Sequence, residues 1–224
     1  MSKPSVKGFS QSQPLRLGVI GPNGRGKTTL FSVIMGLERP LVGTIGYNGE
    51  EVQTKEGWAR LRKNVGLVFQ NSDDQLFMPT VLEDVAFDPL NLGLSPVQAR
   101  QRALDTLRKL GLEGFEGRVT HKLFGGEKRL VALATVLAMQ LRIILLDEPT
   151  NDLDQDTRQK LIDILVGLPQ AQILVTHDWD FLDHVANSLA VLQDGRLVAQ
   201  EKDILHTHTH AHPGGQSRHG HGEV

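Results

Sequence analysis

Near its amino terminus the chain reads Leu15-Arg16-Leu17-Gly18-Val19-Ile20, followed at once by Gly21-Pro22-Asn23-Gly24-Arg25-Gly26-Lys27-Thr28-Thr29. The apolar run has the length of a buried strand, and the glycines allow a tight turn before a helix expected at residues 27–35. Backbone N–H groups in such a turn point at phosphate oxygens. Lys27 can reach the β- and γ-phosphates, and Thr28 offers a hydroxyl to Mg²⁺. The segment therefore predicts an α/β fold with a nucleoside-triphosphate site at residues 21–29.

Two later apolar runs end in side chains that can act on such a ligand. Asp147 and Glu148 follow the aliphatic residues 143–146, and His177 follows residues 173–176. Because the carboxyl ends of parallel strands share one edge of a sheet, we expect these side chains beside the phosphate loop. Asp147 is the candidate Mg²⁺ ligand, and Glu148 is the candidate general base that polarises the attacking water. His177 could donate to the γ-phosphate and orient that water.

Two further segments complete the set. Gln70 ends the apolar run 65–69 and could contact Mg²⁺ or the attacking water. Leu123-Phe124-Gly125-Gly126-Glu127 precedes a helix expected at residues 127–139, and a helix amino terminus attracts anions. Since the chain already has a phosphate loop, we expect residues 124–127 to bind the nucleotide of a second copy, so that two chains close over two ATP molecules. A helix cap without a ligand fits the spacing equally well.

Composition restricts the class of protein. The chain has 224 residues, enough to bury a core as one compound domain. Its 24 Lys and Arg residues nearly balance 26 Asp and Glu residues, so nucleic acid is not an expected partner. The lack of cysteine excludes disulfides and thiolate metal sites. No apolar run reaches the roughly 20 residues of a membrane-spanning helix, so any membrane role would come through a partner.

The remaining pattern gives the organisation of the chain. We expect hairpins at residues 44–52 and 189–200, helices at 58–63 and 155–166, and a helix that starts after Ser95 with a capping box closed by Gln98. The nucleotide-binding core is expected at residues 1–70 and 139–205, with a helical subdomain at 71–138. Residues 206–224 are rich in histidine, glycine, threonine and serine, and are expected to form a disordered tail.

Together these motifs, with the loop 151–154, resemble the nucleotide-binding subunits of ATP-binding-cassette (ABC) transporters over about residues 15–205. The resemblance implies a P-loop nucleotide-hydrolase core with a mainly parallel sheet and an inserted helical subdomain. It implies ATP and Mg²⁺ as ligands and a head-to-tail dimer, here a homodimer. It also implies coupling to integral membrane subunits through the helical insertion, at the cytoplasmic face of the cell membrane.

A finer resemblance lies just past Gln70. Residues 70–77, 80–87 and 89–94 are similar to the energy-coupling-factor ATPases, which drive uptake of vitamins or of cobalt and nickel ions. The tail offers six imidazoles, a donor type that suits Ni²⁺ and Co²⁺. They belong to His206, His208, His210, His212, His219 and His221. We therefore expect nickel or cobalt as the cargo rather than a vitamin, although a polar tail without a metal role remains an alternative.

The sequence departs from the family pattern at three places. Phe124 stands where the family signature carries a serine whose hydroxyl would donate to the γ-phosphate of the partner, so ATP-driven closure or turnover should be weaker. Arg25 replaces a small residue in the phosphate loop. Relatives carry two strands and an adenine-stacking aromatic before the phosphate loop, whereas residues 1–14 offer only Phe9, so the antiparallel β part should be truncated.

Two readings from other classes remain open. A nucleotide-dependent nickel chaperone would pair a phosphate loop with histidines, but the chain has no Asn-Lys-x-Asp motif for guanine, and the segments at Gln70 and Gly125 would be unexplained. A cassette protein acting on DNA or ribosomes is disfavoured by the balanced charge and by the lack of a coiled-coil insertion or a second cassette.

Overall fold

A computed structural model describes residues 13–21, 26–193 and 195–200. Six strands form one sheet in the order β4-β5-β6-β1-β7-β8, in which the first five are parallel and β8 is antiparallel to β7. The bounds are β1 Arg16–Ile20, β4 Val65–Val68, β5 Ile143–Asp147, β6 Ala171–Val175, β7 Ser188–Gln193 and β8 Arg196–Gln200. The prediction of an α/β fold with a mainly parallel sheet is confirmed.

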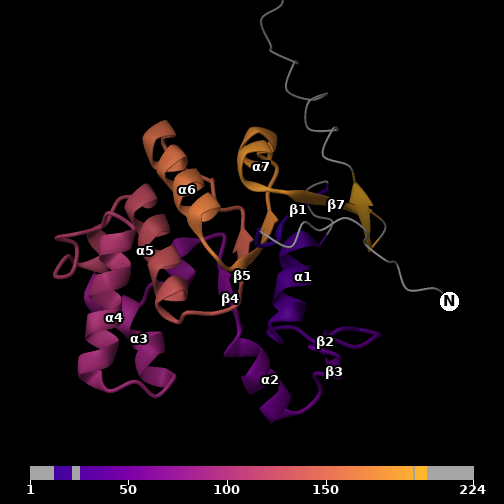
Figure 1. Ribbon diagram of the computed structural model, residues 1–224, viewed down its shortest axis with the longest axis horizontal. Helices are drawn as coiled ribbons and strands as arrows, with labels where there is room; N and C mark the ends of the chain where they lie inside the picture. The colour runs from indigo at the N-terminus through magenta and orange to yellow at the C-terminus, as the bar shows by residue number, and fades with distance from the viewer. Residues whose placement is uncertain (1–12, 22–25, 194, 201–224) are drawn as a thin grey trace, which may run out of the picture.

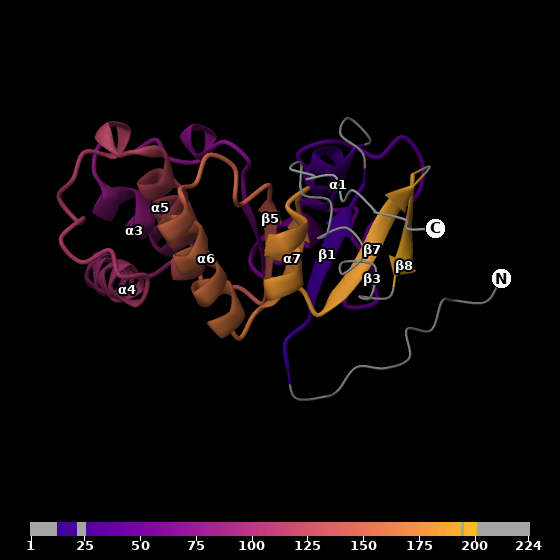
Figure 2. The ribbon, with the colours of Figure 1, turned by 90° about the horizontal axis from the view of Figure 1, so that it is seen from above.

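Helices cover both faces of this sheet (Figures 1 and 2). Helix α1, Lys27–Ile34, lies on one face, and α6, Gln155–Gly167, and α7, Trp179–Val185, lie on the other. The period of two along β5 explains the two layers. Ile144 packs in the cluster that contains residues of α6 and α7, whereas Leu145 packs with Phe31 of α1. The phosphate loop and the carboxyl ends of the strands are positioned by these two apolar layers.

Three helices between β4 and β5 form a bundle at one end of the sheet (Figure 1). They are α3 Val81–Asn91, α4 Pro96–Lys109 and α5 Gly125–Ala138. The capping box at the start of α4 is confirmed: the Gln98 N–H donates to Ser95 Oγ, and Gln98 Oε1 accepts from the Ser95 N–H. The inserted helical part is therefore confirmed, while its exact boundaries at residues 71 and 138 stay a prediction.

Both expected hairpins form. Strands β2 Gly46–Tyr47 and β3 Glu50–Glu51 pair around Asn48 and Gly49, which both have positive φ, as the two-residue turn requires. Gly195, with φ of 72°, follows the end of β7. The predicted truncation of the amino-terminal β part and the histidine tail at residues 206–224 lie outside the described residues.

Three helices differ from expectation. Helix α2, Lys55–Arg62, begins earlier than predicted because Thr54 caps it by accepting from the Gly57 N–H. Helix α5 begins at Gly125, two residues before the predicted start. Helix α7 was not predicted, because seven residues are too few to show a helical period. Within the described residues, none of the helices combines the length and apolarity needed to cross a membrane.

Candidate active site

The phosphate loop leads from β1 into α1. Gly26 caps α1 with φ of 87°, a conformation that a glycine adopts without strain. A Cβ at Gly21 would lie 2.9 Å from the carbonyl oxygen of Leu192, so the chain passes β7 too closely for a larger residue. Lys27 is buried, and its Nζ donates to the carbonyl oxygen of Gly21 at 2.8 Å. The lysine side chain thus reaches from the start of α1 back to the end of β1. The loop residues between them, Pro22, Asn23, Gly24 and Arg25, lie outside the described part.

Asp147 ends β5 beside the start of α1. Its carboxylate accepts a hydrogen bond from Thr28, while the buried Oδ1 has no partner within the described protein. Burial raises the pKa of Asp147 and the neighbouring Glu148 adds to the rise, although the bond from Thr28 and the charges of Lys27 and Arg129 oppose it. A divalent cation would supply the missing partner of Oδ1. A carboxylate and a hydroxyl are oxygen donors of the kind that Mg²⁺ prefers, so these residues fit that ion.

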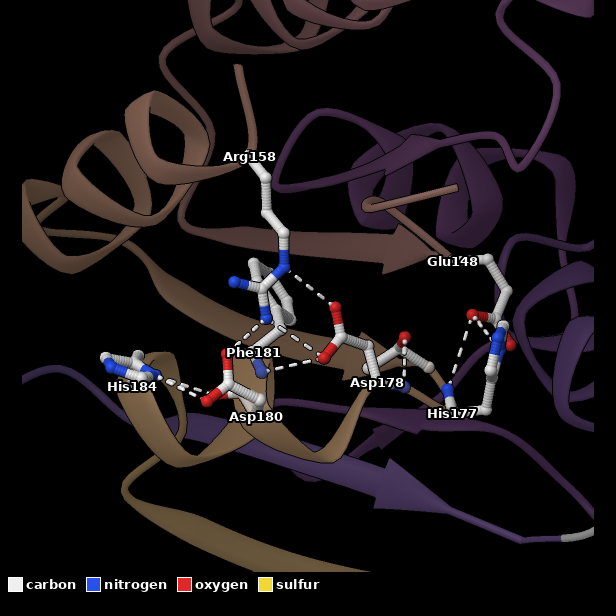
Figure 3. Close-up of polar contacts among 8 residues, drawn as sticks. Glu148, Arg158, His177, Asp178, Asp180, Phe181 and His184 are labelled. Carbon is white, nitrogen blue, oxygen red and sulfur yellow. Dashed lines mark hydrogen bonds and ion pairs between the residues drawn. The ribbon is translucent and has the colours of Figure 1, made fainter. Parts of the chain in front are cut away.

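Glu148 and His177 point at one another across the ends of β5 and β6 (Figure 3). The Glu148 Oε2 lies 3.0 Å from His177 Nδ1, and the Glu148 side chain is 9% exposed against 62% for His177. Glu148 has φ of 44°, and its N–H donates to the carbonyl oxygen of Val175 at 2.8 Å. A left-handed conformation at a non-glycine residue is strained, and the ladder bond to β6 holds it in place. A buried carboxylate held by an imidazole is a suitable general base.

Two adjoining cavities of about 490 and 500 Å³ share Thr28, Gln70, Asp147 and Asn151. The structure brings most of the predicted site residues to these cavities. One is also lined by Gly26, Lys27, Thr29, Glu148, Val175 and His177. The other reaches Gly125, at the start of α5, and Asp152, in the loop after β5. Phe124, Gly126 and Glu127 do not line either cavity, so their predicted part in nucleotide binding remains a prediction.

Arg129 is a site residue that the sequence reasoning missed. It is 5% exposed, and its guanidinium donates to the carbonyl oxygens of Phe69, at 2.6 Å, and Gln70. Gln75 adds to the same anchor by accepting from the Phe69 N–H at 3.1 Å and donating to the carbonyl oxygen of Ala132. The loop that carries Gln70 is therefore fixed to α5. An arginine directly before the apolar run of α5 was the available signal.

The signature segment is ordered by Glu127. Its carboxylate accepts from the Phe124 N–H at 3.0 Å and from both Nη atoms of Arg118, at 2.7 and 3.0 Å. Burial raises the pKa of Glu127, but the bonds from Arg118 and Phe124 outweigh it and hold that pKa below its ordinary value. The Phe124 ring cannot accept the reciprocal bond of a capping box, and Phe124 is 77% exposed. The Glu127 carboxylate is thus bound by Arg118 and by the backbone at the start of α5, and the Phe124 side chain is exposed.

Comparison with known proteins places these features in a family. Residues 9–151 match the family model described as ABC transporter. An ABC transporter ATP-binding protein of Nitratidesulfovibrio vulgaris is 55% identical over 206 residues, which are 92% of this chain and 75% of that protein. The energy-coupling factor transporter ATP-binding protein EcfA of Methanothermobacter thermautotrophicus is 43% identical over 88% of this chain and 65% of its own length.

Solved structures are similar over the same region. The cbiO1 protein of Clostridium perfringens, described as part of the ABC transporter complex cbiONQ, superposes with a TM-score of 0.76 at 32% identity, covering 87% of this chain and 80% of that one. A dimeric ATP-binding cassette in a post-hydrolysis state, bound to ADP and Pi, gives a TM-score of 0.73 at 28% identity, with 84% and 85% covered.

Proposed function

Because this chain belongs to the ABC transporter family of ATP-binding proteins, we propose that it hydrolyses ATP to drive uptake of nickel or cobalt ions. It is an ATPase subunit of the energy-coupling-factor type, which works as a dimer with membrane components at the cytoplasmic face of the membrane. One observation carries the chemistry. The buried Asp147, whose Oδ1 has no partner among the described residues, lies beside Thr28 at the edge where Glu148 meets His177.

The proposed mechanism assigns a role to each residue. The backbone of residues 21–29 and Lys27 would bind the phosphates, and Thr28 and Asp147 would hold Mg²⁺, with Gln70 lining the same cavity. An ion held there would supply positive charge against the phosphates. Glu148 accepts the proton of the attacking water, and His177 holds the Glu148 carboxylate in position. Residues 124–127 serve the nucleotide of the second chain.

Two features of the sequence, rather than the fold, support the proposed cargo. Residues 70–94 resemble those of energy-coupling-factor ATPases, and six imidazoles between His206 and His221 suit Ni²⁺ or Co²⁺. Within the described residues, no group of three or more His, Cys, Asp or Glu side chains could hold a metal ion. The tail residues, which lie outside that part, are therefore the proposed metal-binding segment.

An aromatic pair of one exposed and one half-buried ring supports coupling through the helical part. Phe77 and Phe87 meet edge to face with ring centroids 4.9 Å apart, and Phe77 is 65% exposed. Asp84 holds this segment by accepting from the N–H groups of Phe77 and Met78, at 3.0 and 2.9 Å. Phe77 lies shortly after Gln70 in the chain. A membrane subunit that contacts Phe77 would therefore act on the loop with Gln70, which lines both cavities.

The test uses the chain purified with candidate membrane subunits and reconstituted into vesicles. Glu148→Gln should abolish both ATP hydrolysis and ATP-driven uptake of Ni²⁺ or Co²⁺, because the general base is lost. Glu38→Gln, an exposed residue outside the site, is the matched control and should retain both activities. Hydrolysis that survives in the Glu148 variant would contradict the assigned mechanism.

The same vesicles test the cargo. ATP-driven uptake of a vitamin, with no uptake of either metal ion, would overturn the proposed cargo and favour the vitamin-type importer. Replacing the six tail histidines by alanine should weaken metal binding by the isolated subunit, measured by Ni²⁺ titration, while leaving ATP binding unchanged. Preferential binding of GTP would instead favour a nucleotide-dependent metallochaperone.

A further inference from the structure

A half-buried arginine contacts the segment that follows His177, and it is not among the site residues assigned above (Figure 3). Arg158 belongs to the second turn of α6, and its side chain is 13% exposed. Its Nε donates to Asp178 Oδ2 at 3.0 Å and its Nη2 to Asp178 Oδ1 at 3.0 Å, a two-point contact. Nη2 also donates to Asp180 Oδ2 at 2.7 Å. A planar guanidinium fixes the direction as well as the distance of the carboxylate it binds.

Asp178 receives bonds from three different segments. Besides Arg158 of α6, it accepts from the Phe181 N–H at 2.9 Å, which caps α7, and from the side chain of Thr150, in the loop after β5. Burial would raise the pKa of Asp178, but these bonds outweigh it and hold that pKa below its ordinary value. The carboxylate therefore stays ionised and is held from several sides at neutral pH.

The contact between Arg158 and Asp178 lies close in sequence to both Glu148 and His177. Asp178 directly follows His177, and Thr150 lies two residues after Glu148. The Asp178 N–H is itself fixed by Thr176 Oγ1 at 3.1 Å, on the other side of His177. One carboxylate thus joins the segment that carries the base to the segment that carries its imidazole partner, and Arg158 orients that carboxylate.

We propose that Arg158 is a positioning residue for ATP hydrolysis: through Asp178 it sets His177 against Glu148. The inference rests on the proposed roles of these two residues. His177 needs such support because its side chain is 62% exposed and only one ring nitrogen of it contacts Glu148, at Oε2, to which the His177 backbone N–H also donates at 3.4 Å. A small displacement of a catalytic group costs rate much more than it costs binding. Arg158 therefore affects the turnover of bound ATP rather than its affinity.

The test compares Arg158→Lys with the wild type in the full complex. Lysine keeps the charge but cannot make the two-point contact. The number of Mg·ATP sites is titrated first, and the rate is expressed per occupied site. We expect kcat per site to fall about tenfold, with KM for ATP within twofold. Arg108→Lys is the matched control: Arg108 pairs with Asp105 on the exposed side of α4 and should leave both constants unchanged.

A structural anchor between α6 and α7 would give a different result. It would lower the number of ATP-binding sites or the unfolding temperature and leave kcat per occupied site unchanged, and that outcome overturns the proposal. If Arg158→Lys does not fold, Asp180→Ala replaces it, since that change removes only the Asp180 contact and leaves both contacts with Asp178; it should lower kcat per site two- to threefold. Wild-type protein without ATP hydrolysis would contradict the proposed function instead, so the two failures are distinct.

Discussion

At the scale of single residues, Asp147, the proposed Mg²⁺ ligand, should lower the free energy of unfolding of the protein without bound nucleotide. Folding buries this group and raises its pKa, chiefly by desolvation and then through Glu148, against the opposing effects of Thr28, Lys27 and Arg129. A group whose pKa is raised in the folded state contributes stability below its unfolded pKa, near 4, and that contribution is lost as the pH rises through the folded value. The folded protein is thus less stable with Asp147 ionised, which is the form that the proposed Mg²⁺ site requires.

Asp147→Asn should therefore stabilise the nucleotide-free protein, and increasingly so as the pH rises from about 4 toward 8, since asparagine cannot ionise. The measurement is the free energy of unfolding in urea at a series of pH values. Asp163→Asn, on the exposed part of α6, is the control. A difference between variant and wild type that stays constant with pH would contradict the assigned cause. Stabilisation by Mg·ATP should be lost in the Asp147 variant.

Phe124 tests the signature segment at the same scale. A serine there could accept the Glu127 N–H and complete the capping box, and its hydroxyl could donate to the γ-phosphate of the second chain. A hydrogen bond to a charged group contributes about 1.5–3 kcal/mol, so Phe124→Ser should raise the ATPase rate roughly tenfold. Phe124→Ala removes the ring without adding a hydroxyl and should gain less. A serine variant no faster than the alanine variant would show that the hydroxyl has no such role.

Site residues that lie next to apolar runs could be predicted from the sequence, whereas residues defined by long-range contacts could not. Lys27, Thr28, Asp147 and Glu148 lie next to recognisable apolar runs, so their edge of the sheet could be predicted from the chain itself. The partners of Arg129 stand 60 and 59 residues away in the sequence, and those of Arg158 about 20. Such contacts exist only after the sheet and α5 are assembled, so no local pattern records them.

At the scale of elements, β4 is packed so tightly that it needs a glycine. A Cβ added at Gly66 would lie 2.4 Å from Leu141 Cδ1 and 2.7 Å from Val136 Cγ1, at the contact of β4 with α5. Strand β4 leads into the loop with Gln70, which Arg129 of the same helix binds through its guanidinium. Packing at this strand is therefore part of the support of the site.

Gly66→Ala should destabilise the protein by about 1–3 kcal/mol, because the added methyl group overpacks the core. Gly117→Ala is the matched control, since a Cβ there meets nothing within 4 Å, and it should change the free energy of unfolding by less than about 0.5 kcal/mol. Thermal or urea unfolding of both variants measures the difference. Equal stability of the two variants would contradict the packing seen at β4.

Elements were predictable to different degrees. Strands β1, β4, β5 and β6 could be predicted because each contains a short aliphatic run, and α4 because Ser95, Pro96 and Gln98 mark its start. Helix α7 was missed because only its cap, Asp178, carried a signal. Helix α5 starts at Gly125 rather than at the predicted residue 127. The Glu127 side chain caps the backbone N–H of Phe124 from inside the helix, which allows two glycines to form the first turn.

At the scale of the whole molecule, the strand order could not be predicted from the sequence. The chain places β1 between β6 and β7, with Arg16 opposite Gln172 and Leu17 opposite Ser188, and this brings the phosphate loop beside the segments after β5 and β6. The local patterns predicted that Asp147, Glu148 and His177 share an edge of the sheet with the phosphate loop, and the resemblance implied a mainly parallel sheet, but neither gave the order of the strands. The signature segment lies at the outside of one chain, with Phe124 exposed, which fits a site completed by a second copy.

A dimer that closes over nucleotide should therefore accumulate when hydrolysis is blocked. Glu148→Gln, which keeps the size of the side chain but removes the base, should shift from monomer to dimer mass on addition of Mg·ATP and return when ADP replaces ATP. Light scattering after size exclusion measures the mass. The Glu38→Gln control should show no lasting dimer, because it hydrolyses the ATP. A mass that does not respond to nucleotide would contradict the proposed closure.

The most direct test of the whole account is the equilibrium binding of Mg·ATP to the chain assembled with its membrane subunits. With the backbone of residues 21–29 and Lys27 around the phosphates and Asp147 on the cation, we expect saturable binding of one ATP per chain that disappears when Mg²⁺ is chelated. A complex that is folded and complete but has no affinity for Mg·ATP would contradict the account at its centre.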